Sequence, residues 1–107
     1  MQQVSSAQLK QWLDDPEREK PVLLDVREPW EFGVCRIPDA TAMPMRSVPL
    51  RLKELNRDVH TVVICHHGAR SYQVAMFLEQ NGFTAVYNLH GGLAAWAQQV
   101  DPAMPTY

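Results

Sequence analysis

The stretch CHHGARS, residues 65–71, brings a cysteine, two histidines, a glycine, an arginine and a serine together. A cysteine reacts as its thiolate, which inward-pointing backbone amides and nearby positive charge stabilise. The planar, permanently charged guanidinium of Arg70 suits an oxyanion. The pattern therefore predicts that Cys65 is a nucleophile facing an anion pocket, with residues 66–71 as its binding loop.

Each position of this loop has an expected role. Gly68 lets the chain curl without the steric penalty of a Cβ atom. Ser71 is expected to cap the following helix or to donate a hydrogen bond to the bound group. His66 and His67 are expected to line the mouth of the pocket, and Ala69 completes the loop.

Two other interpretations of the loop are less favoured. A cysteine at a strand end is often a small core residue, but this one is followed by polar residues, a glycine and an arginine. Three consecutive residues such as Cys65-His66-His67 rarely converge on one metal ion, and no further ligand cluster is visible. We therefore expect no metal and no cofactor.

The flanking sequence sets this loop between a strand and a helix. Residues 61–64, TVVI, are a β-branched run typical of a buried strand. Residues 72–81 carry apolar side chains at helical spacing before a glycine. A second apolar run, residues 22–24, ends at Asp25-Val26-Arg27. Ligands bind beyond the carboxyl ends of parallel strands, so Asp25 and Arg27 share one crevice with the loop if the two strands are neighbours.

The rest of the chain alternates between the same two kinds of element. A capping box at Ser5 and Gln8 begins a helix that ends before Pro16. Short apolar strands alternating with helices predict an α/β fold with a mainly parallel sheet. Further helices are expected at residues 29–33, 48–55 and 92–99, and further strands at residues 40–43 and 85–89.

Length and composition favour one ordinary globule over residues 1–107. The formal net charge of −2 argues against nucleic acid or an anionic membrane as a partner. No apolar run approaches the roughly 20 residues of a membrane span, and the N-terminal residues lack the pattern of a secretory signal. With only two cysteines, we expect a reduced, cytoplasmic protein.

Three stretches, in this order, resemble the rhodanese family of sulfurtransferases: LLDVREPWEF at 23–32, CHHGARS at 65–71 and VYNLHGGLAAW at 86–96. The resemblance extends from about residue 4 to residue 100. It implies a single rhodanese-like domain, with a five-stranded, mainly parallel sheet flanked by helices on both faces. It also implies that Cys65 accepts a sulfane sulfur as a persulfide, while Asp25 and Arg27 brace the structure beside the loop.

Loop length separates this chemistry from that of related phosphatases with the same fold, whose loop is one residue longer. Here four residues, HHGA, stand between the cysteine and Arg70. The shorter loop goes with sulfur transfer in this family, and the loop has no carboxylic acid to protonate a leaving alcohol. The expected donor is thiosulfate or a persulfide, and the expected acceptor is cyanide, a thiol or a sulfur-carrier protein.

Two alternatives from other functional classes remain open. One is a binding or regulatory module that keeps the fold without turnover, although such modules often lose the cysteine. The other is a dedicated carrier that receives sulfur from one protein and passes it to another. Uptake of sulfur from a small donor or only from a protein separates these alternatives.

The chain departs from the family pattern at several places. Family members often read G-H-I-P-G-A where this chain has CRIPDA at residues 35–40. Cys35 is expected to be a packing residue, the alternatives being a disulfide with Cys65 or resolution of its persulfide. The histidines replace Arg or Lys of many members, which makes the pocket less cationic. Residues 100–107 are expected to form an extended strap, similar to tails of rhodanese domains fused to adenylating enzymes.

Overall fold

The two most apolar runs of the chain form the centre of a parallel sheet in the computed structural model, which describes residues 1–107. β4 (Thr61–Ile64) is buried along its whole length, and β2 (Val22–Asp25) pairs with it in parallel. Asp25 lies opposite Ile64, so the segments that follow both strands leave the same edge of the sheet. The two strands are therefore neighbours, which is the condition for Asp25, Arg27 and the 65–71 loop to share one crevice.

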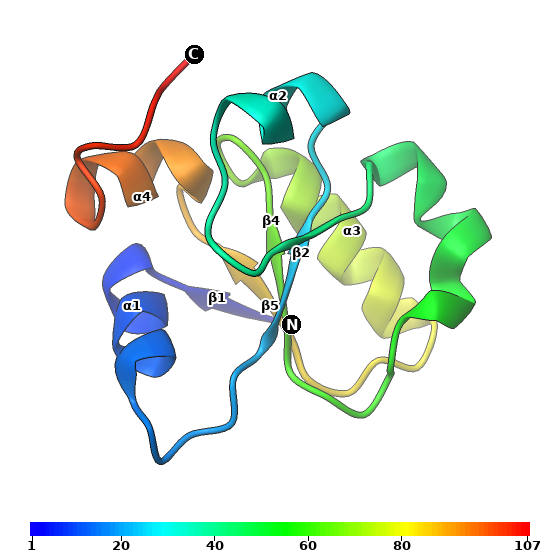
Figure 1. Ribbon diagram of the computed structural model, residues 1–107. Coiled ribbons are helices and arrows are strands. Elements are labelled where there is room, and N and C mark those ends of the chain that lie inside the picture. Colours follow the sequence, from blue (N-terminus) through cyan, green and yellow to red (C-terminus); the bar gives the residue numbers. More distant parts are fainter.

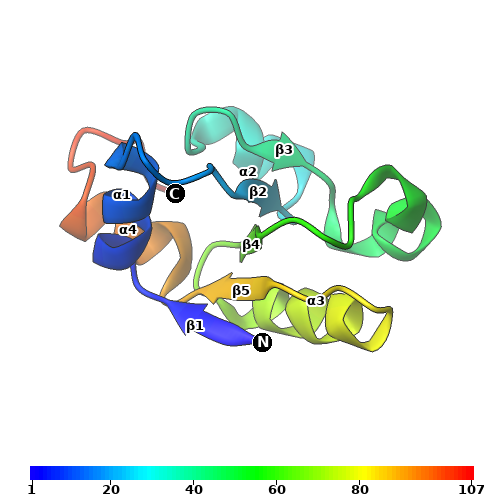
Figure 2. The ribbon, with the colours of Figure 1, turned by 90° about the horizontal axis from the view of Figure 1, so that it is seen from below.

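Five parallel strands make up the sheet, in the order β1-β5-β4-β2-β3. Figure 1 shows the whole fold, and the order of the strands is seen in Figure 2. The outer strands are β1 (Gln2–Val4) and β3 (Thr41–Ala42), and β5 (Val86–Leu89) lies between β1 and β4. The sequence analysis did not anticipate β1. Two of its three residues are exposed glutamines, so it carries no apolar run that could mark a strand.

Helices cover both faces of the sheet, as the sequence predicted. α1 and α4 pack on one face, and α3 lies on the other together with the two 3-10 helices (Figure 2). No helix combines the length and apolar character needed to cross a membrane. The helices are α1 (Ser6–Asp14), α2 (Pro29–Val34), η1 (Met45–Ser47), η2 (Pro49–Glu54), α3 (Ala69–Gln80) and α4 (Gly92–Gln99).

The sheet has a hydrophobic core on each face, and successive side chains of β4 point alternately into one core and the other. Val62 and Ile64 belong to the core beneath α1 and α4, which also contains Trp96. Val63 and Cys65 belong to the core beneath α3. Full burial of an aliphatic side chain contributes roughly 1.5–3 kcal/mol, so packing on both faces holds the end of this strand firmly. The position of Cys65 is therefore determined by the cores on both sides of it.

Three elements differ from their predicted bounds. α3 begins at residue 69 rather than 72, because Gly68 in the left-handed region takes the N-cap position. Residues 48–55 form no α-helix: they contain the 3-10 helix η2, within which Arg51 leaves helical geometry (φ −110°, ψ 15°). The strand predicted at residues 40–43 shortens to the exposed pair that forms β3.

Local signals in the sequence were otherwise reliable. The Ser5 hydroxyl accepts a hydrogen bond from the Gln8 amide at 3.1 Å, and the Gln8 side chain accepts one from the Ser5 amide at 2.8 Å.

Asp39 adopts φ 69° where family members often carry glycine. A short polar side chain tolerates this left-handed conformation, so the turn keeps a positive φ without glycine.

The turn between β5 and α4 lies directly against the backbone of the 65–71 loop. The amides of Leu93 and Ala94 donate to the carbonyls of Cys65 and His66, each at 3.0 Å. Gly92 makes this approach possible: at φ 59°, a Cβ atom there would lie 2.4 Å from the His66 oxygen. The turn and the start of α4 are therefore in close contact with the 65–71 loop.

Replacing Gly92 by alanine is expected to lower the free energy of unfolding by about 2–3 kcal/mol, because the new methyl group would push the turn off the loop. Urea unfolding would measure the change. Gly33→Ala is the matched control, since nothing lies within 4 Å of a Cβ at that position in α2. That control should be neutral or stabilising by up to about 1 kcal/mol. Equal stability of the two variants would contradict the close contact.

Candidate active site

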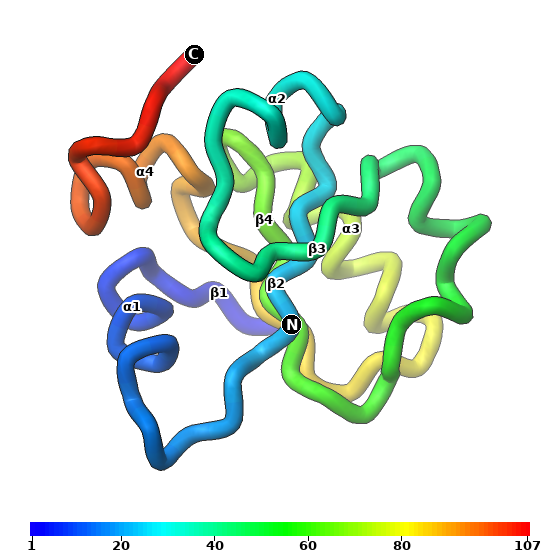
Figure 3. The backbone as a smooth tube through the Cα atoms, viewed as in Figure 1, coloured from blue at the N-terminus to red at the C-terminus, as the bar shows by residue number.

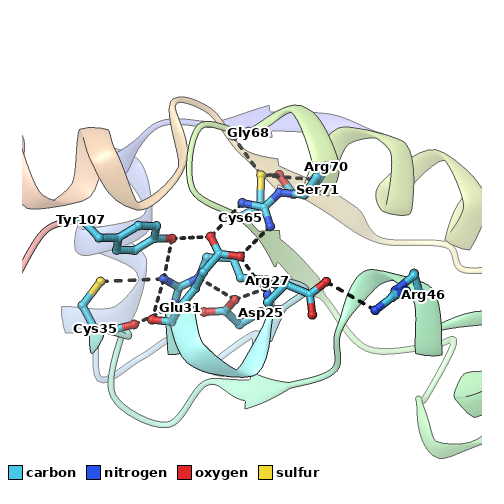
Figure 4. A network of polar contacts seen from close by, with 11 residues as sticks. Asp25, Arg27, Glu31, Cys35, Arg46, Cys65, Gly68, Arg70, Ser71 and Tyr107 are labelled. Carbon is cyan, nitrogen blue, oxygen red and sulfur yellow. Dashed lines mark hydrogen bonds and ion pairs between the residues drawn. The ribbon is translucent and has the colours of Figure 1, made fainter. Parts of the chain in front are cut away.

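Cys65 follows β4 directly, and its side chain is almost completely enclosed, with 1% of the residue exposed. Its Sγ accepts hydrogen bonds from the amides of Gly68 (3.0 Å) and Ser71 (3.3 Å). The Ser71 hydroxyl lies 3.3 Å from the same sulfur (Figure 4). Within the cradle expected from residues 66–71, two amides reach the sulfur. They favour negative charge on it.

The cradle forms because the loop turns into α3 earlier than predicted. Gly68 adopts φ 102° at the N-cap, a conformation open to glycine. Ser71 consequently lies within the first turn of the helix and does not cap it, which corrects one of its two expected roles. From this position the unpaired amides of the first turn point toward the sulfur, where the helix dipole also favours an anion.

A buried asparagine holds the cradle in place. Asn88, on β5, accepts a hydrogen bond from the Ser71 hydroxyl. Its amide group donates to the Gly68 carbonyl (3.2 Å) and to the Gln3 side chain (3.0 Å). The sequence analysis did not single out Asn88, although a polar residue in an otherwise apolar buried strand is a usable signal. The loop is thereby tied to β5 and β1.

Asp25 and Arg27 form a buried ion pair beside the loop, each with 1% of the residue exposed. Arg27 donates to both carboxylate oxygens of Asp25, at 2.8 and 2.7 Å. It also donates to the backbone carbonyls of Glu31 (3.3 Å), within α2, and of Cys35 (2.6 Å), which follows α2. Arg27 thereby links the end of β2 to the last turn of α2.

Arg70 is paired with a carboxylate that the sequence analysis did not anticipate. Its two terminal nitrogens donate to the two oxygens of Glu31, at 2.7 and 3.0 Å (Figure 4). The hydrogen bond from Arg70 lowers the pKa of Glu31 to about 2, against the opposing effect of burial. Glu31 is buried in the first turn of α2. The sequence shows only an acidic residue in a predicted helix, which does not distinguish it from a surface glutamate.

Tyr107, at the end of the tail, completes the polar network. Its hydroxyl donates to Glu31 (2.6 Å) and accepts from Arg27 (3.1 Å). Burial, followed by the hydrogen bond to Glu31, raises the pKa of Tyr107 to about 12, so the hydroxyl remains a donor. The tail runs back from α4 toward α2 (Figure 3), with Met104 buried, as expected for a strap on the surface.

The two histidines of the loop face different surroundings. His66 packs between His67 and Tyr107, with ring centroids 4.1 and 4.4 Å away. Burial lowers the pKa of His66, so its ring is mainly neutral at pH 7. His67 is exposed and lines a pocket that also includes Gly68 and Ala69. His66 is the less exposed of the two and lies against the tail, while its ring stays in contact with that of His67.

No metal-binding constellation accompanies the histidines. No group of three His, Cys, Asp or Glu side chains is arranged to hold a metal ion.

Cys35 is a free, buried cysteine in the core beneath α1 and α4, and its sulfur accepts a hydrogen bond from Arg27 at 3.7 Å. Cys65 is also free. The packing role expected for Cys35 is what the structure describes.

Comparison with known proteins identifies the architecture. A family model described as a rhodanese-like domain matches residues 5–99. The chain belongs to this family. The rhodanese-like domain resembles a solved structure of a rhodanese-like domain protein from Staphylococcus aureus with a TM-score of 0.83 and 32% identity. That match covers 90% of this chain and 91% of the other, so the resemblance and the fold are both confirmed.

Relatives of this rhodanese-like domain carry sulfurtransferase names. It is 42% identical over 96 residues to a sulfurtransferase of Allochromatium vinosum, covering 90% of this chain and 88% of the relative. It is 32% identical over 120 residues to the adenylyltransferase and sulfurtransferase MOCS3 of Arabidopsis thaliana. The second match covers 97% of this chain but 25% of that protein. These names support membership of a sulfurtransferase family.

Acid should selectively weaken the contribution of the Glu31–Arg70 pair to stability. The pKa of Glu31 is about 2 in the folded protein, against an ordinary value of 4.5 for a glutamate side chain. The contribution is complete above pH 4.5 and is lost as the pH falls toward 2. The difference in unfolding free energy between wild type and Glu31→Gln should narrow by up to about 3 kcal/mol over this window.

Urea unfolding of both proteins, at a series of pH values from neutral down to about 2, would measure this difference. Glu54→Gln is a suitable control, because Glu54 pairs with Arg51 at the surface, where ion pairs contribute little. Stability curves that stay parallel for wild type and Glu31→Gln would contradict the depressed pKa of Glu31.

Proposed function

We propose that this rhodanese-like domain is a sulfurtransferase in which Cys65 carries a sulfane sulfur between a donor and an acceptor. The observation that carries this proposal is the cradle around Sγ, formed by the amides of Gly68 and Ser71 and the Ser71 hydroxyl. Residues 66–71 form the binding loop, and Asp25 and Arg27 support it. The proposed unit is a single domain over residues 1–107, working in a reduced, cytoplasmic compartment.

The reaction has two half-reactions, as covalent catalysis implies. The Cys65 thiolate attacks the outer sulfur of the donor, a Cys65 Sγ–S bond forms, and the donor's S–S bond breaks. Sulfite leaves when the donor is thiosulfate, and a thiolate leaves when it is a persulfide. An acceptor nucleophile then attacks the outer sulfur and releases the Cys65 thiolate.

Burial of Cys65 explains how the persulfide serves as a carrier. The free sulfur is almost inaccessible, but an added sulfur extends about 2 Å beyond it toward solvent. The cradle amides that face Sγ in the free state stabilise the negative charge present before and after transfer. The outer sulfur is thus the atom offered to the acceptor, while the protein sulfur remains enclosed.

The acceptor we propose is a thiol, either small or on a sulfur-carrier protein, with cyanide as its substitute in an assay. A protein acceptor is favoured because the tail at residues 100–107 resembles the tails of rhodanese domains fused to adenylating enzymes, which activate sulfur-carrier proteins. One relative's name also joins sulfurtransferase with adenylyltransferase. A module without turnover is the alternative, and the intact cradle around a free Cys65 argues against it.

Incubation with thiosulfate or a small persulfide should add the mass of one sulfur atom to the wild-type protein, and cyanide or a thiol should remove it. Cys65→Ser should gain nothing, because its hydroxyl cannot form the persulfide. Intact-protein mass spectrometry would measure both. Cys35→Ser is the matched control and should retain the gain, since Cys35 is the other free cysteine.

Each remaining outcome of this experiment has a definite meaning. Sulfur uptake only from a protein persulfide would indicate a dedicated carrier. Uptake from no donor would leave a binding module and overturn the proposed function. Equal uptake by Cys65→Ser and wild type would overturn the assignment of the nucleophile.

A further inference from the structure

The charged groups at the entrance to Cys65 cancel one another. Arg27 is paired with Asp25 and Arg70 with Glu31, both through two hydrogen bonds. The remaining ionisable ring packed against this network, His66, is mainly neutral at pH 7 because burial lowers its pKa. The proton of the Ser71 hydroxyl is already donated to Asn88. The site therefore offers an incoming sulfur donor two backbone amides, but no unpaired cation within this network.

We propose that Glu31 is a specificity-determining residue that withholds the charge of Arg70 from dianionic donors. With Glu31 on both terminal nitrogens, Arg70 is neutralised where thiosulfate would need it. The site then favours a persulfide of an organic thiol, whose reactive group carries at most one negative charge. This inference rests on the proposed function and specifies its donor.

Glu31 is held too firmly to yield Arg70 easily. Its side chain is 5% exposed, and its carboxylate accepts four hydrogen bonds. Besides the two from Arg70, one comes from the Glu28 amide (2.9 Å) and one from the Tyr107 hydroxyl (2.6 Å). Tyr107 is itself held by Arg27. A dianion that competes for Arg70 must break contacts in a network anchored at a buried ion pair.

Electrostatic repulsion also disfavours thiosulfate relative to a persulfide. Arg70 is close enough to Cys65 for the cysteine's charge to contribute to its raised pKa, after the larger effect of Glu31. A thiosulfate dianion approaching the Cys65 thiolate would be repelled by that thiolate, and Arg70, paired with Glu31, would not offset the repulsion. Buried or partly buried charges are screened weakly by salt. A persulfide avoids most of this repulsion.

The preferred first step balances without any further reactant. The Cys65 thiolate attacks the outer sulfur of R–S–SH, and the Cys65 Sγ–S bond forms as the donor's S–S bond breaks. The electron pair leaves with the inner sulfur as R–S⁻, which takes a proton from water. The hydrogen on the outer sulfur stays with the new persulfide.

The test compares two donors, thiosulfate and cysteine persulfide, in wild type and Glu31→Gln. The ratio of kcat/KM for thiosulfate to kcat/KM for the persulfide should rise about tenfold in the variant, because Arg70 becomes free to bind the dianion. Using the ratio cancels a general loss of active protein. Adding Arg70→Ala to Glu31→Gln should abolish the rise.

Glu28→Gln is the matched control, since it removes the same charge from the start of α2. Its side chain is 44% exposed and lies 3.9 Å from Arg46, and it makes no contact with Arg70. The donor ratio should change less than about twofold. A similar rise in this control would assign the effect to net charge alone and overturn the proposal.

Tyr107→Phe provides a second variant should Glu31→Gln fail to fold. It keeps the ring against His66 but removes one of the four hydrogen bonds that hold Glu31. The donor ratio should rise in the same direction by about two- to threefold. An unchanged or lower ratio in the folded variants would overturn the proposal, because Glu31 would then align Arg70 for the anion.

A binding measurement separates failure of this inference from failure of the proposed function. Calorimetric titration with thiosulfate needs no sulfur transfer and can be made in a Cys65→Ser background. Adding Glu31→Gln to that background should tighten thiosulfate binding about tenfold. Absence of persulfide formation would overturn the function alone, whereas unchanged or weaker thiosulfate binding would overturn the role of Glu31.

Discussion

The buried ion pair between Asp25 and Arg27 is the interaction on which the surroundings of Cys65 depend. From this pair, hydrogen bonds reach the last turn of α2 and the hydroxyl of Tyr107. α2 and Tyr107 then position Glu31, and Glu31 positions Arg70. Removing one partner of a buried pair typically costs about 3–5 kcal/mol, since the other charge is left unsatisfied. In the intact pair, the desolvation of both charges offsets much of their attraction. The main effect of the pair is therefore to fix the geometry of α2 and Tyr107.

The two helix N-termini near Cys65 serve different purposes. The first amides of α4 bind the carbonyls of Cys65 and His66, so they are already satisfied by the backbone. The amides at the start of α3 point instead at the Cys65 sulfur. Helix N-termini favour anions only through amides without another partner. Of the two helices, α3 is the one that can stabilise a charged sulfur.

Much of the fold could be predicted from the sequence because it follows from local patterns. The β4 run and the Ser5 cap are examples. The start of α3 was misjudged because Ser71 is a favourable cap residue, whereas a left-handed Gly68 takes that position. Glu31 lies 39 residues from Arg70 along the chain, and Asn88 lies 17 residues from Ser71. Tyr107 lies 76 residues from Glu31, which it holds in place. Only the assembled fold brings such residues together, so no local pattern could reveal their pairing.

Under the proposed function, the enclosure of Cys65 has a consequence for the order of the two half-reactions. Its main chain is bound by α4 and its sulfur by α3, and 1% of the residue is exposed. A sulfur held in this way can be reached by one molecule at a time. The spent donor must therefore depart before the acceptor approaches, which is the basis of ping-pong kinetics. A ternary complex of donor, protein and acceptor would need a second route to a sulfur that is enclosed from both sides.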